Sequence, residues 1–457
     1  MKTRNLSELF SGVKFKLYRR GVICLMCLMV TSLLAIGSFG RAEAGGLIRD
    51  AEIEALLWDY AEPIFIAAGL NPDHVDIGII DDKRLNAFVT GGKNIYFHTG
   101  LILEADHPNM VIGVIAHETG HITGGHLARS SEAMGKARTP ILLGTLLGIG
   151  AIAAGQSDLG MGLMGLGQQA ALGSYLSFSR AQEAAADQVA LDLLQATGQS
   201  AEGILDMMNM LAGQEILSEV QQDPYIRSHP LSRDRVNFMQ HGVDESKFSH
   251  VTDSPELQFR HDMAKAKIYG FLDHPGTTFR RYRRDDSLPA QYAKAIAYYK
   301  QGQTGLALTH IDRLIKTMPE NPFFFELKGQ VLYEAGKIAQ STLPYQKAVA
   351  LAPDMQLIRL ALATAKIALE KENEAQEAIR ELKIVLRQEP ENASAYYQMA
   401  IAYAQTGQPG RAELATAERF YLYGDKQKAK QHATRAMKIL RTNSPEWLRA
   451  VDISSSS

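Results

Sequence analysis

The sequence predicts a mainly α-helical protein in two parts: an α+β domain with a small sheet, followed by an α-solenoid. From about residue 48 to residue 250, helix-like segments surround one short alternating segment that is typical of a strand. After residue 289, glycine and proline recur with a period of 34 residues, which is typical of stacked helix pairs. With 457 residues and 46% hydrophobic content, the chain is long enough for two or three folded domains.

The first 44 residues have the pattern of an export signal. Six basic residues between Lys2 and Arg20 precede an uncharged apolar run, residues 21–40, and the small-residue sequence AEA ends at Ala44. We expect cleavage after Ala44. The run is also long enough to span a bilayer, so a retained inner-membrane anchor is the alternative. Both interpretations place the rest of the chain outside the cytoplasm, because the positive cluster stays inside.

Charge and cysteine content restrict the partners and the metal sites that we expect. Removal of residues 1–44 takes away seven basic and two acidic residues and leaves a net charge of −7, so we expect no nucleic-acid partner. The two cysteines, Cys24 and Cys27, lie in the apolar run, and the cleaved chain would contain no thiol. Any metal site must then use histidine and carboxylate ligands.

The segment PNMVIGVIAHETGHITGGH, residues 108–126, predicts a mostly buried helix that carries a metal site. His117 and His121 are four residues apart and about 40° apart around a helix axis, so both imidazoles can reach one ion. Zinc accepts such ligands, and Glu118 is placed to act as a general base on a zinc-bound water. His126 would lie roughly 180° from His117 on a continued helix. We therefore expect His126 to be structural and the third ligand to come from another segment.

The best candidate for that ligand lies in SFSRAQEAAADQVALDLL, residues 177–194, which has high helix propensity. Glu183 and Asp187 lie four residues apart on one face of this predicted helix. Glu183 would complete the zinc site, and Asp187 would accept the free N–H of a ligating histidine. Two solvated acids on an ordinary amphipathic helix are the alternative, and the intact H-E-x-x-H motif favours the ligand interpretation.

Four segments in a fixed order resemble the M48 family of zinc metallopeptidases. They are H-E-x-G-H-x-x-x-x-H at 117–126, S-R-x-x-E-x-x-A-D at 179–187, H-P-x-x-x-x-R at 229–235, and NAFVTGGKNIYFHTGLI at 86–102. The resemblance covers about residues 48–240 and implies a zincin-type metalloprotease domain with one zinc ion per chain.

The resemblance also implies a role for each site residue. Zinc would lie on His117, His121 and Glu183, with Glu118 as the base and Asp187 and Arg235 in support. His229 would act near the metal, either by stabilising the oxyanion that forms during peptide attack or by occupying the open metal position in a resting state. A histidine in a surface loop is the alternative for His229, because prolines flank its segment.

The segment KNIYFH, residues 93–98, predicts a strand that follows a glycine turn. If this strand lies at the edge of the cleft, an extended substrate would pair with Asn94, Ile95, Tyr96 and Phe97 as an added strand. Such pairing recognises backbone more than side chains. It predicts a preference for unfolded or locally extended polypeptide.

Residues 139–179 carry one charge, Asp158, and many glycines. They predict two short apolar helices joined near residues 156–158, and the first apolar run, residues 141–155, is shorter than the ~20 residues that span a bilayer. We expect these helices to pack over the active-site core. The alternative is a mobile flap that makes peripheral contact with a membrane or an unfolded protein.

A repeat period begins near residue 289. Gly302 and Gly336 are 34 residues apart, as are Pro319 and Pro353, and the units resemble tetratricopeptide repeats. About four units can be recognised, and the last degenerates toward a terminal helix pair. Such stacks bind peptides or proteins.

One unit, residues 354–390, departs from this period. It is three residues longer than the others, and Glu370 stands where the others have glycine. In the unit before it, Pro344 interrupts the second helix. These departures affect the unit boundaries and not the repeat class.

The predicted organisation has five parts: a signal peptide (1–44), a metalloprotease domain (45–250), a connecting helix and linker (251–288), a repeat domain (289–450) and a disordered tail (451–457). An exported M48-type protease with such repeats resembles a family of periplasmic proteases that attend outer-membrane β-barrel proteins. The resemblance implies unfolded or misassembled proteins as substrates and the outer-membrane assembly machinery as a partner of the repeats. A chaperone or scaffold with little or gated proteolysis is the alternative function.

Overall fold

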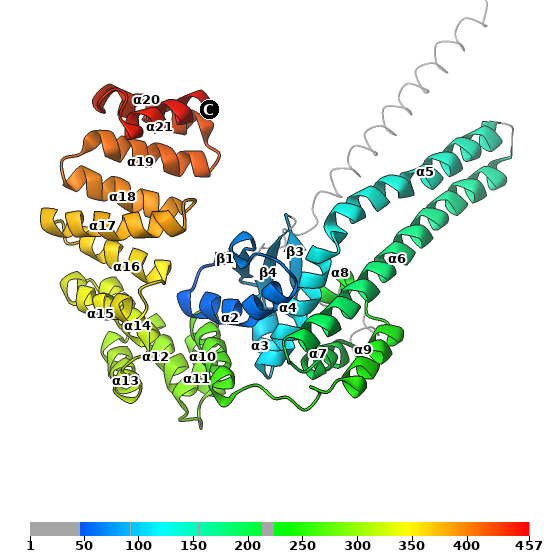
Figure 1. The fold of residues 1–457 in the computed structure, drawn as a ribbon, viewed down its shortest axis with the longest axis horizontal. Coiled ribbons are helices and arrows are strands. Elements are labelled where there is room, and N and C mark those ends of the chain that lie inside the picture. The colour runs from blue at the N-terminus through cyan, green and yellow to red at the C-terminus, as the bar shows by residue number, and fades with distance from the viewer. Residues whose placement is uncertain (1–45, 92, 154–155, 213–223, 457) are drawn as a thin grey trace, which may run out of the picture. The chain divides into compact units, whose positions relative to one another are not determined.

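The computed structural model describes residues 46–91, 93–153, 156–212 and 224–456. The predicted export signal, with the alternative membrane anchor at residues 21–40, lies outside the described residues. Within the described ranges, no helix combines the length and the apolar character needed to cross a membrane. The fold is mainly α-helical with one small sheet, as predicted, and the repeats follow the sheet domain (Figure 1).

The sheet has four short strands in the order β1-β2-β4-β3. β1 (Leu47–Ile48) is antiparallel to β2 (Ile77–Ile80), and β2 is parallel to β4 (Asn94–His98). β3 (Ala87–Thr90) is antiparallel to β4 and forms the edge of the sheet. The predicted strand at residues 93–98 is therefore confirmed as β4.

The proposed pairing of a substrate with β4 is wrong. Ile95 pairs with Ile77 of β2 on one side and with Val89 of β3 on the other. Tyr96 and Phe97 likewise pair with both neighbouring strands, and Asn94 pairs with Thr90 of β3. The outer strand next to β4 is β3, whose residues precede the glycine turn and whose other edge pairs with no described strand.

Helices α2 (Ala51–Ala67), α3 (Thr99–Glu104), α4 (Pro108–Thr123) and α7 (Glu202–Ala212) build one hydrophobic core with the sheet. α4 starts with a proline in its first turn, where a missing N–H costs nothing. Its residues 108–120 are all buried, as expected of a helix that is apolar around most of its circumference. The core therefore holds the metal-site helix rigidly along most of its length.

Residues 139–179 differ from the prediction. Residues 139–153 and 157–179 belong to two long helices, α5 (His126–Ala153) with 28 residues and α6 (Ser157–Ala196) with 40 residues. Figure 1 shows these helices side by side, running away from the sheet. The prediction that they pack over the active-site core is wrong, because their outer surface exposes large apolar side chains: Ile141, Leu142, Leu143, Leu146, Leu147, Ile149, Leu159, Met161, Leu166, Leu172 and Leu176.

The packing of α5 on α6 explains this exposure. A Cβ on Gly144 would lie 2.7 Å from the carbonyl oxygen of Leu163 and 2.9 Å from Cα of Gly167. The two backbones therefore meet at glycines, and the larger apolar side chains point outward. We call this contact the glycine seam.

The chain continues through α8 (Pro224–Ser228), α9 (Arg233–Glu245), α10 (Pro255–Leu272) and α11 (Pro275–Arg281). α10 is the predicted connecting helix. Besides its apolar contacts, α10 carries a buried lysine, Lys267, that is 4% exposed. Its Nζ lies 2.8 Å from Asp50, 3.2 Å from Glu52 and 3.8 Å from Glu326.

Tyr292 completes this group, which we call the Lys267 cluster, by donating a hydrogen bond from its hydroxyl to Glu52 at 2.9 Å. Asp50 also caps α2, because its carboxylate accepts the backbone N–H groups of Glu52 and Ile53. The cluster thus ties the start of α2 and the helix α10 to the first two helix pairs of the repeats.

The repeats form five helix pairs that stack in sequence (Figure 1). Their helices are α12 (Leu288–Lys300) with α13 (Thr304–Thr317), α14 (Pro322–Glu334) with α15 (Ile338–Leu351), α16 (Gln356–Ile367) with α17 (Glu372–Gln388), α18 (Ala393–Gln405) with α19 (Pro409–Leu422), and α20 (Lys426–Ile439) with α21 (Pro445–Ser456). Pro344 lies inside α15 and does not end it. The predicted repeat class is confirmed.

The turn inside each pair explains the predicted glycine period. Gly302 and Gly336 adopt φ values of +71° and +74°, which favour glycine. Glu370, at the position where the third unit lacks its glycine, adopts the same left-handed region with φ of +55°. The turn geometry is therefore kept, although a side chain there is strained.

The predicted disordered tail at residues 451–457 is wrong over residues 451–456. They form the end of α21, where Ile453 is 1% exposed and packs with Ala450 against α20. The serine-rich ending obscured this apolar pair in the sequence. Residue 457 lies outside the described residues.

Candidate metal centre

Two metal-ligand candidates come from one face of α4. His117 and His121 lie one turn apart, and their Nε2 atoms are 3.1 Å apart. Gly120 lies between them at the contact with α6, where an added Cβ would lie 2.9 Å from both Cα and the carbonyl oxygen of Ala186. This close approach brings α6 against the histidine face of α4.

Glu183 of α6 lies opposite the two histidines. Its carboxylate oxygens are 3.4 Å from Nε2 of His117 and 3.5 Å from Nε2 of His121. His229, which directly follows α8, places Nδ1 3.3 Å from Nε2 of His117 and 3.2 Å from Glu183. The ligand atoms of these four residues all lie within 4.8 Å of one another.

The spacing of these atoms fits a tetrahedral metal ion. Ligand atoms about 2.0–2.1 Å from a tetrahedral zinc ion lie about 3.3–3.4 Å apart. The Nε2 atoms of His117 and His121 are 3.1 Å apart, and Glu183 lies 3.4 Å from the first through Oε2 and 3.5 Å from the second through Oε1. Neutral imidazoles with one carboxylate are a common donor set for zinc. Nδ1 of His229 lies at similar distances from His117 and Glu183, so His229 is a fourth candidate ligand.

Comparison with known proteins agrees with this geometry. Residues 48–243 match the description "Peptidase family M48". Residues 48–243 form a peptidase domain of family M48. Two further segments, residues 292–355 and 362–429, match "Tetratricopeptide repeat". The two halves of the chain thus correspond to the two predicted parts.

Individual relatives are more distant. The "Beta-barrel assembly-enhancing protease" of Yersinia pestis is 24% identical over 63% of this chain and 60% of its own length. The protein of the same name from Escherichia coli (strain K12) is 23% identical over 55% of this chain and 52% of its own length. "Metalloprotease LoiP" of Escherichia coli (strain K12) is 29% identical over 36% of this chain and 62% of its own length. The chain therefore matches about half to three fifths of the length of these relatives.

Asp187 and Arg235 support the ligands of the M48 domain. Oδ1 of Asp187 lies 3.0 Å from Nδ1 of His117, so the carboxylate orients this imidazole. Arg235 binds Asp187 through two hydrogen bonds of 2.7 and 2.8 Å, and its Nη1 lies 2.9 Å from Glu183. α9 positions this arginine, because Ser232 caps the helix by accepting the backbone N–H of Arg235.

His126 contacts the site without joining the ligand set, in agreement with the prediction. α4 ends at Thr123, and Gly125 turns the chain with φ of +60° before α5 begins at His126. Nδ1 of His126 then lies 2.9 Å from Nδ1 of His121. His126 therefore orients His121 from the side that faces away from the other ligands.

Glu118 is buried beside the ligands, with an exposed fraction of 1%. Within the described residues, neither of its carboxylate oxygens takes a hydrogen bond. The His229 ring lies beside this carboxylate, with Nε2 3.4 Å from Oε1. A buried carboxylate without hydrogen bonds is costly and is common at functional sites.

The pKa values of the two histidines of α4 indicate that the carboxylates beside them stabilise a positive charge at the metal centre. Burial alone would lower the pKa of His117, but Asp187 and Glu183 outweigh burial and raise this pKa to about 9. Burial, together with His117 and His229, lowers the pKa of His121 to about 2. Without a metal ion, the carboxylates therefore hold a proton on His117, and a bound cation would take over this role.

The pKa of Glu118 moves in the opposite direction from that of Glu183. Burial raises the pKa of Glu118, while the nearby histidines only partly offset it. For Glu183, burial is outweighed by His117 and His229, which lower its pKa. Two neighbouring carboxylates with opposite shifts divide naturally into a proton acceptor and a ligand.

A cavity of about 260 Å³ opens onto the site. Glu118, His121, Glu183 and His229 form its polar side. Its remaining walls come from β3, through Phe88 and Val89, and from the bases of α5 and α6, through Leu127, Phe178 and Gln182. The free edge of β3 therefore borders the metal ligands.

The structure brings together His117, Glu118, His121, Glu183, Asp187, His229 and Arg235, all of which the sequence singled out. It adds Tyr225, whose ring centroid lies 4.7 Å from that of His229, and the β3 wall. Tyr225 carries no sequence signal apart from its place four residues before His229. The β3 wall had a signal, because AFVT alternates before the glycine turn.

Proposed function

We propose that the chain is an exported zinc-dependent metalloendopeptidase whose repeats bind a client or partner protein. One observation carries the proposal: ligand atoms of four residues lie within 4.8 Å of one another beside a buried carboxylate that has no hydrogen-bond partner among the described residues. Family M48 membership of residues 48–243 supports the reaction class.

The residues of this chain divide the work of peptide hydrolysis. Zinc bound by His117, His121 and Glu183 would supply a Lewis acid that lowers the pKa of water. Glu118, with its raised pKa, accepts the proton of the attacking water and later passes it to the leaving amine. Asp187 holds the His117 imidazole, and Arg235 holds Asp187.

His229 has two roles that its position permits. Its Nδ1 lies 3.3 Å from Nε2 of His117 and 3.2 Å from Glu183, so His229 would help to hold the zinc ion and would then exclude the attacking water. In this resting arrangement it blocks the reaction. With the ring turned away, its N–H is placed to stabilise the oxyanion. We favour the blocking role for the described conformation.

The substrate would bind as an added strand along β3. This strand has one free edge, and its residues line the cavity together with the base Glu118. Backbone pairing of this kind selects extended polypeptide. Unfolded or misassembled proteins are therefore the substrate class that we propose.

The relatives suggest a more specific setting. Two of them carry the name "Beta-barrel assembly-enhancing protease". For this chain we propose a periplasmic location, misassembled outer-membrane β-barrel proteins as clients, and contact of the repeats with the outer-membrane assembly machinery. The exposed apolar residues of α5 and α6 support peripheral contact with a membrane or with an unfolded client.

A chaperone or scaffold is the second candidate function. The position of His229 over the metal ligands favours it, because a blocked site would leave the repeats and the α5–α6 hairpin as the main binding surfaces. Client protection that survives Glu118→Gln would support this alternative.

The test measures bound zinc and proteolysis of an unfolded β-rich protein for the wild type and three variants. We expect one zinc per chain, loss of cleavage in Glu118→Gln with zinc retained, and weaker zinc binding in Glu183→Gln. His229→Ala should raise the rate of cleavage if the imidazole blocks the site, and should lower it if the imidazole stabilises the oxyanion.

Two surface variants serve as matched controls. His241→Ala and Glu245→Gln change the same residue types on α9, where both side chains are about 70% exposed. Both controls should retain wild-type zinc content and cleavage. Absence of zinc, or unchanged cleavage in Glu118→Gln, would contradict the peptidase proposal.

A further inference from the structure

The longest helix of the repeats opens a groove in the C-terminal half of the stack. α17 has 17 residues, whereas α13, α15 and α19 have 14 each. The three additional residues are the excess in the repeat period, and they add almost one turn. The last turn of α17 carries Leu386 and Arg387 over α18.

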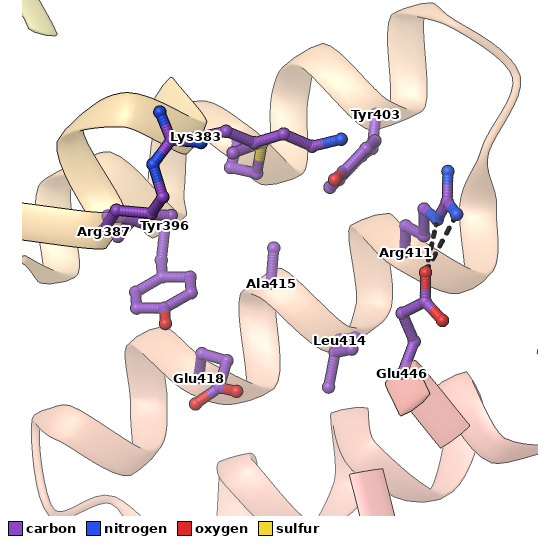
Figure 2. A pocket seen from close by; sticks show the side chains of 11 residues that line it. Lys383, Arg387, Tyr396, Tyr403, Arg411, Leu414, Ala415, Glu418 and Glu446 are labelled. Atoms are coloured by element: carbon purple, nitrogen blue, oxygen red, sulfur yellow. Dashed lines mark hydrogen bonds and ion pairs between the residues drawn. The ribbon is translucent and has the colours of Figure 1, made fainter. Parts of the chain in front are cut away.

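This groove contains a cavity of about 360 Å³ between α17, α18 and α19. Its floor is apolar and well packed, with Met399 and Ala415 only 4% and 5% exposed. Figure 2 shows the lining side chains around an open centre at Ala415, with Arg387 and Tyr396 on one side and Arg411 and Glu446 on the other. Tyrosine, arginine and methionine are the residue types enriched at protein–protein contacts.

The acidic groups of the groove are already paired. Glu446 accepts hydrogen bonds of 2.8 and 3.2 Å from Arg411. Glu418 accepts two hydrogen bonds, of 2.7 and 2.8 Å, from Arg449. Neither carboxylate is therefore available to a positively charged ligand.

Two basic groups are not paired in this way. Lys383 and Arg387 lie one turn apart on the groove face of α17, and both are exposed. Among the described residues, neither has a carboxylate at ion-pair distance, and Figure 2 draws no such contact for them. The groove therefore combines an apolar floor with two basic side chains on its rim that form no direct ion pair with the described residues.

We propose that this groove binds a polypeptide segment of a partner protein in which an apolar side chain is flanked by carboxylates. The apolar side chain fills the cavity above Met399 and Ala415, and the carboxylates pair with Lys383 and Arg387. Arginine pairs with a carboxylate in a planar, bidentate manner, which makes Arg387 the more selective of the two. This site rests on the part of the proposed function in which the repeats bind a partner protein, and it requires neither the metal ligands nor peptide hydrolysis.

The test uses fluorescence anisotropy with the full chain and a fluorescein-labelled peptide, Gly-Glu-Phe-Glu-Leu-Gly. All proteins carry Glu118→Gln so that the peptide is not cleaved. Two matched peptides replace either both glutamates by glutamine or both apolar residues by alanine. We expect each replacement to weaken binding at least fivefold.

The protein variant reverses the rim charge with Lys383→Glu and Arg387→Glu, and it should weaken binding at least tenfold. The control makes the same charge change with Arg313→Glu and Lys316→Glu on α13, where Lys316 precedes its proline by three residues, as Arg387 does. Binding should change less than twofold in the control. Circular dichroism spectra and sedimentation velocity accompany each variant.

Several outcomes would overturn the proposal. They are no binding of the parent peptide, equal binding of the glutamine or alanine peptides, retained binding in the rim variant, or an equal loss in the control. The peptide comparison uses unaltered repeats, so it decides the question even if the rim variant unfolds. Self-association that only the rim variant abolishes would assign the groove to a second copy of this chain and would also overturn the proposal.

Discussion

The metal centre and the Lys267 cluster are both buried groups of charged residues, but they differ in how their charges are satisfied. In the Lys267 cluster, three carboxylates surround one ammonium group, and Tyr292 donates to Glu52. In the metal centre, the ligand atoms point at one common position, and Glu118 takes no hydrogen bond from the described residues. The charged groups of the Lys267 cluster pair with one another, whereas the residues of the metal centre have the arrangement of metal ligands.

This difference in the pairing of charged groups distinguishes the structural role of the Lys267 cluster from the chemical role of the metal centre. Both clusters contain burial-shifted pKa values, so a shifted pKa does not distinguish them. The useful distinction is whether each buried polar atom has a partner. Variants that remove one member of each cluster test this distinction.

The largest effect should follow the loss of Lys267. Lys267→Met leaves Asp50 and Glu52 buried without their cation, so the free energy of unfolding should fall by about 3–5 kcal/mol. Urea unfolding at pH 7 measures this change. Lys328→Met is the control, because Lys328 pairs with Asp312 at the surface, where a pair contributes about 0–1 kcal/mol. A loss below about 1 kcal/mol in Lys267→Met would remove the contrast between the two clusters.

The next effect should appear in metal affinity. Asp187→Asn keeps the shape of the side chain but weakens its hold on His117 and Arg235, so zinc affinity should fall about 10–100-fold. Competition with a chromophoric chelator measures the affinity. Asp192→Asn lies on the same helix at an exposed position and should leave zinc affinity unchanged. Equal affinities for both variants would show that Asp187 does not support the ligands.

A smaller effect on the free energy of unfolding should come from Glu326 and should depend on pH. Burial, reinforced by Asp50 and Glu52 against the attraction of Lys267, raises the pKa of Glu326 to about 7. The folded chain then holds this proton more tightly than the unfolded chain. The resulting stability is fully present below about pH 4.5 and is lost as the pH rises through 7.

Glu326→Gln should remove this dependence, because glutamine stays neutral. Between pH 5 and pH 8, the wild type should lose on the order of 1–2 kcal/mol relative to the variant. Urea unfolding at a series of pH values checks the difference, and Glu334→Gln, on the same helix, should keep the wild-type profile. A parallel profile for Glu326→Gln would show that Glu326 is ionised throughout.

The smallest effect should come from a strained residue outside both clusters. Glu370→Gly relieves a left-handed conformation, so the free energy of unfolding should rise by about 1 kcal/mol. Thermal unfolding measures the gain. Glu372→Gly, in the first turn of α17, should instead lower stability by about 0.5–1 kcal/mol. A loss in Glu370→Gly would indicate that its side chain contributes an interaction that outweighs the strain.

The sequence predicted the parts of the site that follow helix geometry. The spacing of His117, Glu118 and His121 determines one helix face, and the separation of Glu183 from Asp187 places both acids on another. The repeat glycines predicted the turns of the helix pairs, including the unusual position of Glu370. These features depend on neighbours within one helical turn or one repeat.

Other features depend on pairing across long distances and had no such signal. The conditional expectation that a substrate pairs with β4 failed because strand order is set by partners elsewhere in the chain, and Ile95 has one on each side. Lys267 lies 217 residues from Asp50, and nothing in the spacing of either residue predicts their contact. The length of the α5–α6 hairpin was also missed, because its glycines indicated breaks although they form the contact between the helices.

The glycine seam has an energetic consequence for the hairpin. Small residues occupy the contact between α5 and α6, so closing this contact removes little leucine surface from water. Burial of one leucine-sized side chain contributes about 1.5–3 kcal/mol of favourable free energy. Side chains such as Leu142, Leu146 and Leu166 remain exposed in the folded chain and do not contribute this free energy to folding. The exposed side chains of the hairpin can therefore still bind an apolar surface. Burial of only a few of them would hold the protein on such a surface.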